Sequence, residues 1–359
     1  MYKVAIIGCG RISHKIAEGV AKNNDRMKLV VLCDPIEEKM FETEKTYNKK
    51  MDNEVSILKY KDYKEILKEN KIDIAIIATE SGYHEEIGLY FLENGVNLII
   101  EKPLAMSIEG AQKLVDTAKK NNLKLAASHQ NRFNYPIQLL KKAIKENRLG
   151  RIFNGMARIL WTRDDNYYLQ APWRGTWALD GGTLMNQCIH NIDLINWMMD
   201  DEIDTVYAQT SNYIRNIEAE DYGVILIRYK SGKIATIEGS AIVYPKNLEE
   251  TLTVTGEKGT VIIGGMAVNK INTWRVEGDN EQEYLSIDCG DPNSVYGYGH
   301  EALYRDFVEA LDENREPLVN GIAGLNAVKI ILAAYKSQKT GLPIKFSEFK
   351  NFKSIDMVR

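Results

Sequence analysis

Several features that mark specialised protein classes are scarce or absent in this sequence. Only four cysteines occur in 359 residues and none forms a C-x-x-C pair, so we expect free thiols and a cytoplasmic protein rather than a disulfide framework. No apolar run approaches the roughly 20 residues that span a bilayer, and a strand signal at residues 2–7 leaves no room for a signal peptide. The formal net charge of −4 offers no bulk attraction for nucleic acid or anionic membranes. No two of the five histidines lie at ligand spacing, so we expect no metal.

The first part of the chain alternates strand and helix signals. Short apolar runs predict strands, and amphipathic stretches between them predict helices. The expected strands cover residues 2–7, 28–33, 73–78, 97–101 and 124–128, and the expected helices cover residues 11–23, 36–47, 62–69, 83–94 and 107–121. This order predicts a parallel sheet with helices on both faces, because consecutive parallel strands need crossover connections. We therefore expect a doubly wound α/β domain of the Rossmann type over residues 1–125.

The remaining chain has a different texture, with longer strands joined by tight turns. The expected strands cover residues 152–163, 203–211, 222–230, 233–243, 249–256 and 259–264, and the expected helices cover residues 136–147, 183–199, 301–313 and 321–340. Turns such as residues 230–233 are typical of antiparallel pairs. We expect an α+β domain with an open, mostly antiparallel sheet over residues 126–359. Its C-terminal helices are expected to pack back on the first domain.

A glycine-rich turn follows the first expected strand. Gly8 permits a tight turn, and Gly10 lets a pyrophosphate approach the backbone. The helix that follows offers free N–H groups at its N-terminus, so we expect Arg11 and Ile12 to lie at the same anion site. Ser13 stands where a third glycine is usual, which exchanges one small residue for another. The pattern predicts a dinucleotide site.

The end of the second expected strand carries an acidic residue. Asp34 lies about 24 residues beyond Gly10, where an acid normally binds the ribose hydroxyls. Its charge would repel a 2′-phosphate, so the sequence favours NAD over NADP. The alternative is a nucleotide-free domain in which Asp34 caps the helix that begins after Pro35.

Two polar segments follow the next buried strands, at the sheet edge where such folds bind ligands. Thr79 and His84 lie after one strand, and Glu101 and Lys102 lie after the next. We expect all four residues at the cofactor. The Lys102–Pro103 step predicts a tight turn with a cis peptide, which would direct the Lys102 ammonium toward the nicotinamide. Alternatively, Lys102 serves only solubility, as lone lysines usually do.

A third segment with side chains suited to catalysis begins the expected helix at residues 183–199. A double glycine at residues 181–182 precedes it, and Asn186, His190 and Asp193 recur at a spacing that places them on one face. A single histidine on an apolar helix is more often a core residue. A row of three polar side chains directly after two glycines favours a functional site.

Together these segments resemble the glucose–fructose oxidoreductase/inositol dehydrogenase/MocA (Gfo/Idh/MocA) family. The resemblance covers essentially the whole chain and includes the turn at residues 256–259. It implies two domains, a nicotinamide cofactor and alcohol oxidation, with Lys102 and His190 as the usual active-site pair. Many members carry aspartate four residues before that histidine, where this chain has Asn186. This departure removes one carboxylate from the usual trio.

A narrower resemblance rests on residues 130–134, 173–182 and 184–187, which are similar to UDP-N-acetylglucosaminuronate 3-dehydrogenases of surface-polysaccharide sugar synthesis. A nucleotide-linked uronate carries a diphosphate and a carboxylate, which arginine forks recognise well. We expect aromatic residues of the 167–177 segment to form apolar walls. The alternative is that the arginines only pair with Asp164 and Asp165. The expected substrate-binding residues are Gln130, Asn131, Arg132, Arg163, Trp173, Arg174, Asn186 and His190.

The expected activity is therefore NAD-dependent oxidation of the C3 hydroxyl of such a sugar. His190 suits the role of general base and Lys102 that of alkoxide stabiliser, although the reverse assignment stays open. Asn186 would orient the substrate without titrating. The alternatives are oxidation of an unactivated sugar or inositol, or a catalytically silent NAD-binding sensor. We expect a homodimer or homotetramer formed through the C-terminal sheet.

Overall fold

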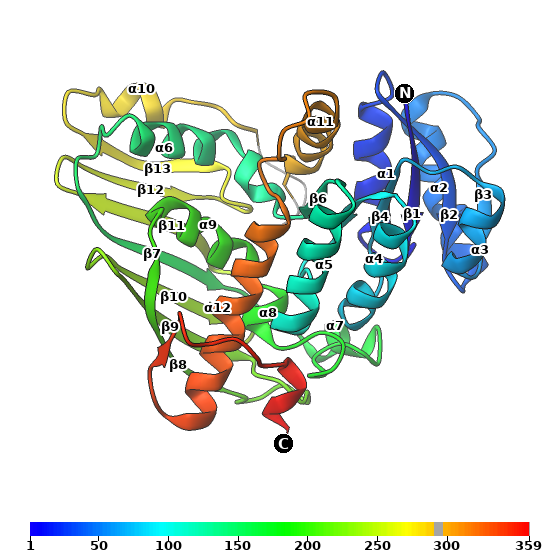
Figure 1. Cartoon of the computed structure of the whole chain (residues 1–359). Helices are drawn as coiled ribbons and strands as arrows, with labels where there is room; N and C mark the ends of the chain where they lie inside the picture. The colour runs from blue at the N-terminus through cyan, green and yellow to red at the C-terminus, as the bar shows by residue number, and fades with distance from the viewer. Residues whose placement is uncertain (291–296, 359) are drawn as a thin grey trace. The chain divides into compact units, whose positions relative to one another are not determined.

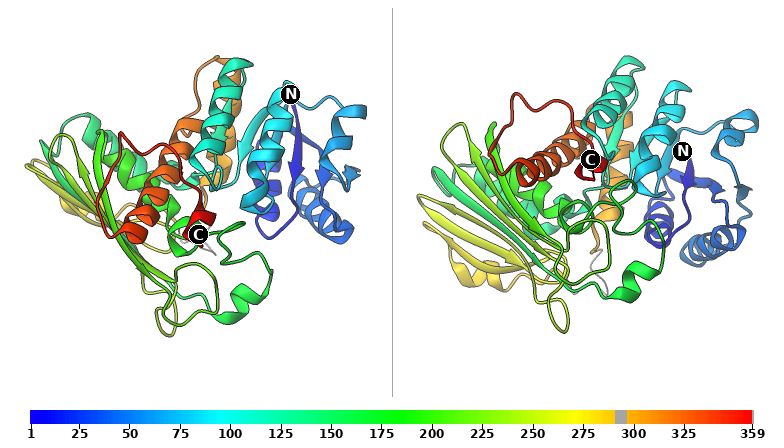
Figure 2. Two further views of the ribbon diagram at one scale, coloured as in Figure 1. Left: turned by 60° about the horizontal axis from the view of Figure 1, so that its bottom comes forward. Right: turned by 90° about the horizontal axis from the view of Figure 1, so that it is seen from below.

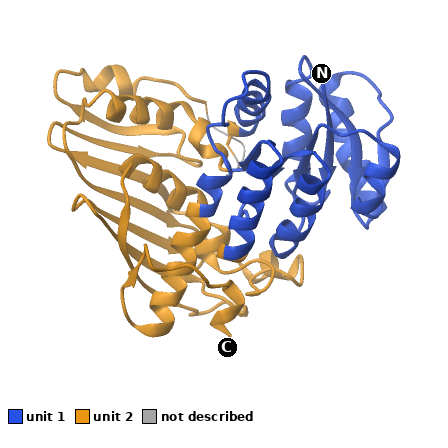
Figure 3. Ribbon diagram, viewed as in Figure 1, with its two compact units in different colours: residues 1–105, 109–128, 300–325 blue, residues 106–108, 129–299, 326–359 orange. Residues whose placement is uncertain are grey.

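The computed structural model describes residues 1–290 and 297–358, which gather into two units (Figure 3). The first unit comprises residues 1–105, 109–128 and 300–325, and the second comprises residues 106–108, 129–299 and 326–359. The sequence predicted a division at residue 125, three residues before the point where the second unit takes over the chain. Residues 300–325 return to the first unit.

The first unit is built on a six-stranded parallel sheet in the order β3-β2-β1-β4-β5-β6 (Figure 1). Its strands are β1 (Tyr2–Ile7), β2 (Met27–Cys33), β3 (Leu58–Tyr60), β4 (Ile74–Ile77), β5 (Asn97–Ile100) and β6 (Leu125–Ala127). Its helices are α1 (Ser13–Lys22), α2 (Glu37–Met51), α3 (Tyr63–Glu69), the 3₁₀ turn η1 (Ser81–Tyr83), α4 (His84–Glu93), α5 (Ile108–Lys120) and α11 (Gly299–Asp312). The doubly wound α/β expectation is confirmed. The short β3 was not predicted, because its three residues are only partly buried or exposed.

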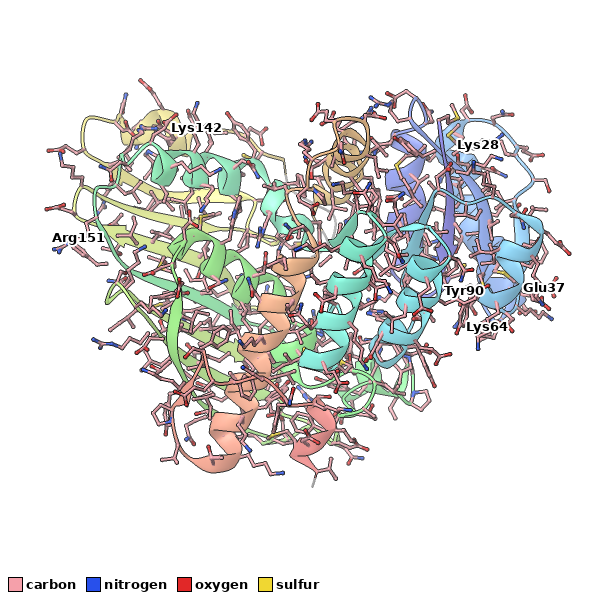
Figure 4. All side chains as sticks on the ribbon, in the orientation of Figure 1. Lys28, Glu37, Lys64, Tyr90, Lys142 and Arg151 are labelled. Atoms are coloured by element: carbon pink, nitrogen blue, oxygen red, sulfur yellow. The ribbon has the colours of Figure 1, made fainter. Side chains whose placement is uncertain are left out.

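The centre of this sheet is apolar on both faces. All four residues of β4 are buried, as are the last four residues of β1. This pattern is the one expected of parallel strands covered by helices. Charged side chains lie at the surface of the helices instead, as Glu37 and Lys64 do in Figure 4.

The second unit is built on an eight-stranded sheet in the order β13-β12-β11-β7-β10-β9-β8-β14. All neighbouring strands are antiparallel except β7 and β10, which run parallel, so the open and mostly antiparallel sheet is confirmed. The strands are β7 (Ile152–Leu160), β8 (Ile203–Ser211), β9 (Tyr222–Tyr229), β10 (Ile234–Ser240), β11 (Glu249–Gly256), β12 (Gly259–Gly264), β13 (Lys270–Val276) and β14 (Ile344–Lys345).

The helices of this unit are η2 (Gln130–Phe133), α6 (Tyr135–Lys145), α7 (Asp165–Leu169), α8 (Thr183–Asn186), α9 (Ile189–Met199), α10 (Glu281–Leu285), α12 (Gly321–Thr340) and η3 (Ser354–Met357), with the first residues of α12 in the first unit. The views of Figure 2 show α9 (green) and α12 (orange to red) on the same side of the sheet. Side chains alternate accordingly: Ile225 and Ile227 of β9 are buried, whereas Val224 and Leu226 are exposed. We call the side of the sheet that bears the exposed residues Met156, Val224, Leu226 and Ile234 the outer face.

Two expectations for this unit are corrected. The helix predicted over residues 183–199 is two helices, α8 and α9, separated at Gln187 and Cys188. Strand β13 was missed, although Trp274 anchors it: its ring is buried and stacks on Tyr284 of α10 at 4.2 Å. A buried tryptophan within a polar stretch was the signal that periodicity alone did not register.

Candidate active site

The glycine-rich turn has the geometry of an anion-binding loop. Gly8 has a φ of +93°, and a Cβ there would lie 2.5 Å from the carbonyl carbon of Ala78, so only glycine fits. A Cβ on Gly10 would meet no heavy atom of the described chain within 4 Å, which leaves its backbone open to a ligand. Helix α1 begins at Ser13, directly after Arg11 and Ile12. The turn therefore fits a pyrophosphate at a helix N-terminus.

Asp34 ties this turn to the end of β2. One carboxylate oxygen, Oδ2, accepts a hydrogen bond from the Cys9 amide at 2.9 Å. The other, Oδ1, accepts from the Ile36 amide at 2.9 Å, and the side chain is buried. Each carboxylate oxygen has a further lone pair, so Asp34 can still accept a hydrogen bond from a hydroxyl. The bond to Ile36 is a local turn contact and not a helix cap, because α2 has Ile36 at its N-cap position and no side-chain cap hydrogen bond.

The loops that follow β4 and β5 are joined by His84. Its Nδ1 lies 2.8 Å from the carbonyl oxygen of Pro103, and its Nε2 lies 3.1 Å from the carbonyl oxygen of Thr79. The imidazole is only 1% exposed, and burial lowers the pKa of His84. We predicted a cofactor contact for this residue, and that contact stays a prediction; the ring nitrogens face carbonyl oxygens of the two loops.

The turn that carries Lys102 has the expected form. The Lys102–Pro103 peptide is cis, as predicted. The preceding Glu101 is buried, which raises the pKa of its carboxyl group, and the positive charge of Lys102 opposes that rise. The Lys102 side chain is partly exposed. The first unit thus carries the Lys102 ammonium group at the carboxyl edge of its sheet, on a turn that His84 contacts at the Pro103 carbonyl oxygen.

In the second unit the break between α8 and α9 changes the surroundings of Asn186. Its Nδ2 donates to Oδ1 of Asp180, and its Oδ1 accepts from Nε2 of Gln187 at 3.0 Å. Asp180 also accepts from the Gly175 amide at 2.7 Å and is 2% exposed. The sequence predicted the loss of a carboxylate at position 186. The structure supplies one from Asp180, which the sequence reasoning did not single out although it directly precedes the double glycine.

His190 lies against a second histidine that sequence reasoning also missed. The ring of His129 meets that of His190 edge to face, with centroids 5.6 Å apart and planes at 88°. His129 is 1% exposed, and His190 is partly exposed. Both Gln130 and Asn131, predicted to contact substrate, follow His129 and are buried. The position of His129 two residues after the end of β6 was the available signal.

Arg132 forms a buried ion pair with Asp193. Its Nε and Nη2 donate to the two carboxylate oxygens of Asp193 at 2.7 and 2.6 Å. Both side chains are buried, and the guanidinium lies 4.9 Å from the ring centroid of Trp197. The pair braces η2 against α9. This pairing is the structural alternative anticipated for the arginines, although the partner is Asp193 and not the acids of the 164–165 segment.

The other two predicted arginines, Arg163 and Arg174, lie against Tyr167 and Gln187. We call these four residues the arginine–tyrosine cluster. The guanidinium carbons of Arg163 and Arg174 lie 5.3 and 4.4 Å from the Tyr167 ring centroid. Arg174 donates to the Tyr167 hydroxyl at 2.7 Å, and Arg163 donates to Oε1 of Gln187 at 3.0 Å. Trp173, also predicted at the substrate, packs on Arg174 at 4.7 Å.

No carboxylate of the described residues lies within 4 Å of either guanidinium in this cluster. The nearby acids have other partners: Asp164 caps α7 by accepting from the Tyr167 amide at 2.9 Å, and Asp165 pairs with Arg215 at 3.5 Å. Two neighbouring guanidinium groups that form no ion pair within 4 Å among the described residues are suited to bind an anionic ligand.

A buried acid supports the double glycine at the start of α8. Oε1 of Glu220 accepts from the Leu184 amide at 2.9 Å and from the Tyr335 hydroxyl at 3.0 Å. Burial raises the pKa of Glu220 to about 8. Any side chain at position 182 would collide with this carboxyl group, so Gly182 allows the close approach.

Among residues 1–290 and 297–358, no group of three or more histidine, cysteine or acidic side chains is arranged to hold a metal ion. Within the same ranges, no helix combines the length and the hydrophobicity that a membrane-spanning segment needs.

Comparisons with known proteins identify the family of the chain. Residues 2–129 match the family model described as the oxidoreductase family, NAD-binding Rossmann fold, and residues 141–346 match that of the oxidoreductase family, C-terminal alpha/beta domain. The chain is 24% identical to myo-inositol 2-dehydrogenase of Thermotoga maritima, over 96% of this chain and 99% of the relative.

Among solved structures, the WlbA dehydrogenase from Bordetella pertussis, in complex with NADH and UDP-GlcNAcA, is 32% identical with a TM-score of 0.85. That match covers 96% of this chain and 98% of the other. The WlbA dehydrogenase from Chromobacterium violaceum is likewise 32% identical with a TM-score of 0.85, over 96% and 95% of the two chains. With both domains matched by the family models, the chain belongs to the Gfo/Idh/MocA oxidoreductase family and has that family's NAD-binding Rossmann domain.

Proposed function

We propose that this protein oxidises the C3 hydroxyl of UDP-N-acetylglucosaminuronate to a ketone, with NAD as the hydride acceptor, in the synthesis of surface-polysaccharide sugars. The observation that carries the proposal is the arginine–tyrosine cluster, which presents two guanidinium groups without a carboxylate partner among the described residues. The similarity at 32% identity to two dehydrogenases crystallised with NADH and UDP-GlcNAcA supports it. The free state of the four cysteines supports a cytoplasmic location.

The first unit would hold the cofactor. Gly8 and Gly10 keep the backbone accessible to the pyrophosphate, and Asp34 would accept hydrogen bonds from the ribose hydroxyls. NAD, when bound, accepts a hydride from the carbinol carbon of the substrate. The Lys102 turn and the Thr79 loop lie at the carboxyl edge of the same sheet.

Asp34 makes cofactor selectivity testable. NAD should bind more tightly than NADP by about tenfold or more, because apposing a 2′-phosphate to a carboxylate is strongly unfavourable. Asp34→Asn should narrow this gap while it retains an acceptor for the Cys9 or Ile36 amide. Isothermal titration with both cofactors measures the effect. Equal affinities in the wild type would contradict the role given to Asp34.

His190 and Lys102 together would remove the proton of the substrate hydroxyl and stabilise the alkoxide that forms. His190 accepts the proton as general base, and Lys102 donates a hydrogen bond to the developing alkoxide. The exchange of these two roles remains the alternative. Asn186 is held at both ends of its amide by Asp180 and Gln187, so it is suited to orient a substrate hydroxyl without taking up a proton. The edge-to-face contact with His129 supports the orientation of the His190 ring.

The direct experiment follows reduced nicotinamide by absorbance with a panel of substrates. UDP-N-acetylglucosaminuronate should reduce NAD, whether the NADH is released or stays bound, whereas UDP-N-acetylglucosamine, which lacks the carboxylate, should react poorly. Free glucose and inositol should also react poorly. Efficient turnover of inositol with no response to UDP-sugars would establish the second candidate, an inositol dehydrogenase, which the similarity to the Thermotoga maritima enzyme favours. No turnover with any of these, despite NAD binding, would favour a silent sensor.

We also propose that the protein self-associates through the outer face of its eight-stranded sheet. Met156, Val224, Leu226 and Ile234 are between 36 and 44% exposed on neighbouring strands of this face. Polar side chains such as Thr236 and Arg228 lie among them, and exposed apolar groups gathered on one sheet face commonly mark an interface. Light scattering should give a dimer or tetramer, and Leu226→Glu should shift it toward the monomer. A monomeric wild type would contradict the proposal.

A further inference from the structure

The ring of His84 is buried and faces two backbone carbonyl oxygens. His84 begins α4, yet its ring lies between the loops that follow two neighbouring strands of the sheet. One ring nitrogen faces Pro103, the residue after Lys102, at 2.8 Å, and the other faces Thr79 at 3.1 Å. The side chain is 1% exposed. His84 is therefore the link between the Thr79 loop and the turn that bears Lys102.

Both neighbours of the ring are carbonyl oxygens, which only accept hydrogen bonds. A neutral imidazole has a single N–H, so it satisfies one of them, whereas an imidazolium would satisfy both. Burial lowers the pKa of His84, and the positive charge of Lys102 acts in the same direction. Near neutral pH the ring is thus neutral. The shorter contact, to Pro103, is the better place for its one proton.

We propose that His84 is a positioning residue for Lys102: its Nδ1–H donates to the Pro103 carbonyl and fixes the turn from which the Lys102 ammonium projects. This proposal rests on the role given to Lys102 in the proposed function. His84 itself contacts neither substrate nor reacting atoms in this scheme. Its contribution is to fix the backbone of the turn from which the Lys102 side chain projects.

Three substitutions separate the two contacts of the ring. Asparagine places its amide nitrogen near the position of Nδ1, and glutamine places its amide nitrogen near that of Nε2. His84→Asn should therefore keep the bond to Pro103 and turn over within about threefold of the wild type, whereas His84→Gln and His84→Leu should lose about ten- to a hundredfold in kcat through misplacement of Lys102. The dissociation constant for NAD should change little in all three.

His300 provides a matched control. It is a second buried histidine of the first unit, 5% exposed, and burial lowers its pKa to about 4. It lies near α1 and Tyr304, whereas the contacts with the Thr79 and Pro103 carbonyl oxygens are made by His84. His300→Leu should reproduce the cost in melting temperature of removing a buried imidazole without the loss in kcat.

A second readout does not need turnover. Acetylation of Lys102 by acetic anhydride, followed by mass spectrometry relative to the exposed Lys28, reports how the turn is held. Lys102 should react about threefold faster or more in His84→Gln and His84→Leu, because a loosened turn opens more often. It should react at the wild-type rate in His84→Asn and His300→Leu.

The outcomes distinguish the positioning role from the proposed function. If no sugar is oxidised by the wild type, the function fails while the labelling pattern still decides the role of His84. Rescue by glutamine and not by asparagine would overturn the assignment to Pro103. Wild-type labelling and turnover in folded His84→Leu would overturn the positioning role altogether.

Discussion

His190→Asn is expected to slow hydride transfer by about two to four powers of ten, the usual scope of general-base loss. Lys102→Met should have a similar effect, because the methionine fits the space of the lysine stem while the charge at the alkoxide is gone. The fold and NAD binding should survive both changes. Single-turnover absorbance measurements at saturating NAD give the rate, and melting curves give the state of the fold.

The double variant tests whether the two groups act together. If Lys102 and His190 serve one hydroxyl, removing both should be little worse than the more damaging single change, because groups that act as a unit are strongly non-additive. Independent roles would multiply the two losses. A purely structural His190 would instead show a lower melting temperature with normal transfer in the folded protein, and normal transfer would remove it from the site.

The arginine–tyrosine cluster predicts the second large effect. Arg163→Met and Arg174→Met should each raise the KM for UDP-N-acetylglucosaminuronate by about ten- to a hundredfold, because hydrogen bonds to charged groups contribute about 1.5–3 kcal/mol. The kcat should change much less, as expected for interactions made equally in ground and transition states. Steady-state kinetics with NAD held at saturation measures both parameters.

Arg151→Met is the matched control. Arg151 also lies over an aromatic ring, that of Phe153 at 5.1 Å, and it is exposed directly before β7 (Figure 4). Its loss should leave the KM unchanged. If Arg163→Met and Arg174→Met behave like this control, the anionic-substrate proposal loses its main support, and the inositol alternative becomes the better description.

Much of the fold could be predicted from apolar periodicity, because the strands of both sheets are long enough or buried enough to show it. The four-residue apolar run of β4 and the alternation of Ile225 and Ile227 with exposed neighbours are clear signals. Two strands, β3 and β13, were missed because their residues do not show a clear apolar pattern. Strand β3 has three residues with no buried side chain, and β13 depends on the stacking of Trp274 with a residue of a later helix.

The candidate site was less accessible to sequence reasoning, because its groups are brought together by loops. Asn186 and His190 were placed on one helix by spacing, but Gln187 and Cys188 interrupt that helix, and Asp180 reaches Asn186 from the preceding loop. His129 meets His190 across about sixty positions of sequence. Spacing rules describe neighbours within one element, so contacts of this kind have no periodic signature.

The return of residues 300–325 to the first unit has a consequence for how the chain can be divided. Tyr304 of α11 lies directly against Gly19 of α1, where a Cβ would come within 2.6 Å of the ring. A fragment that ends at Ser128 would contain every strand of the parallel sheet but would leave this surface of α1 bare. A protease that nicks the chain between the units would therefore not release the nucleotide-binding part intact, and the two pieces should stay together on a gel-filtration column until they are denatured.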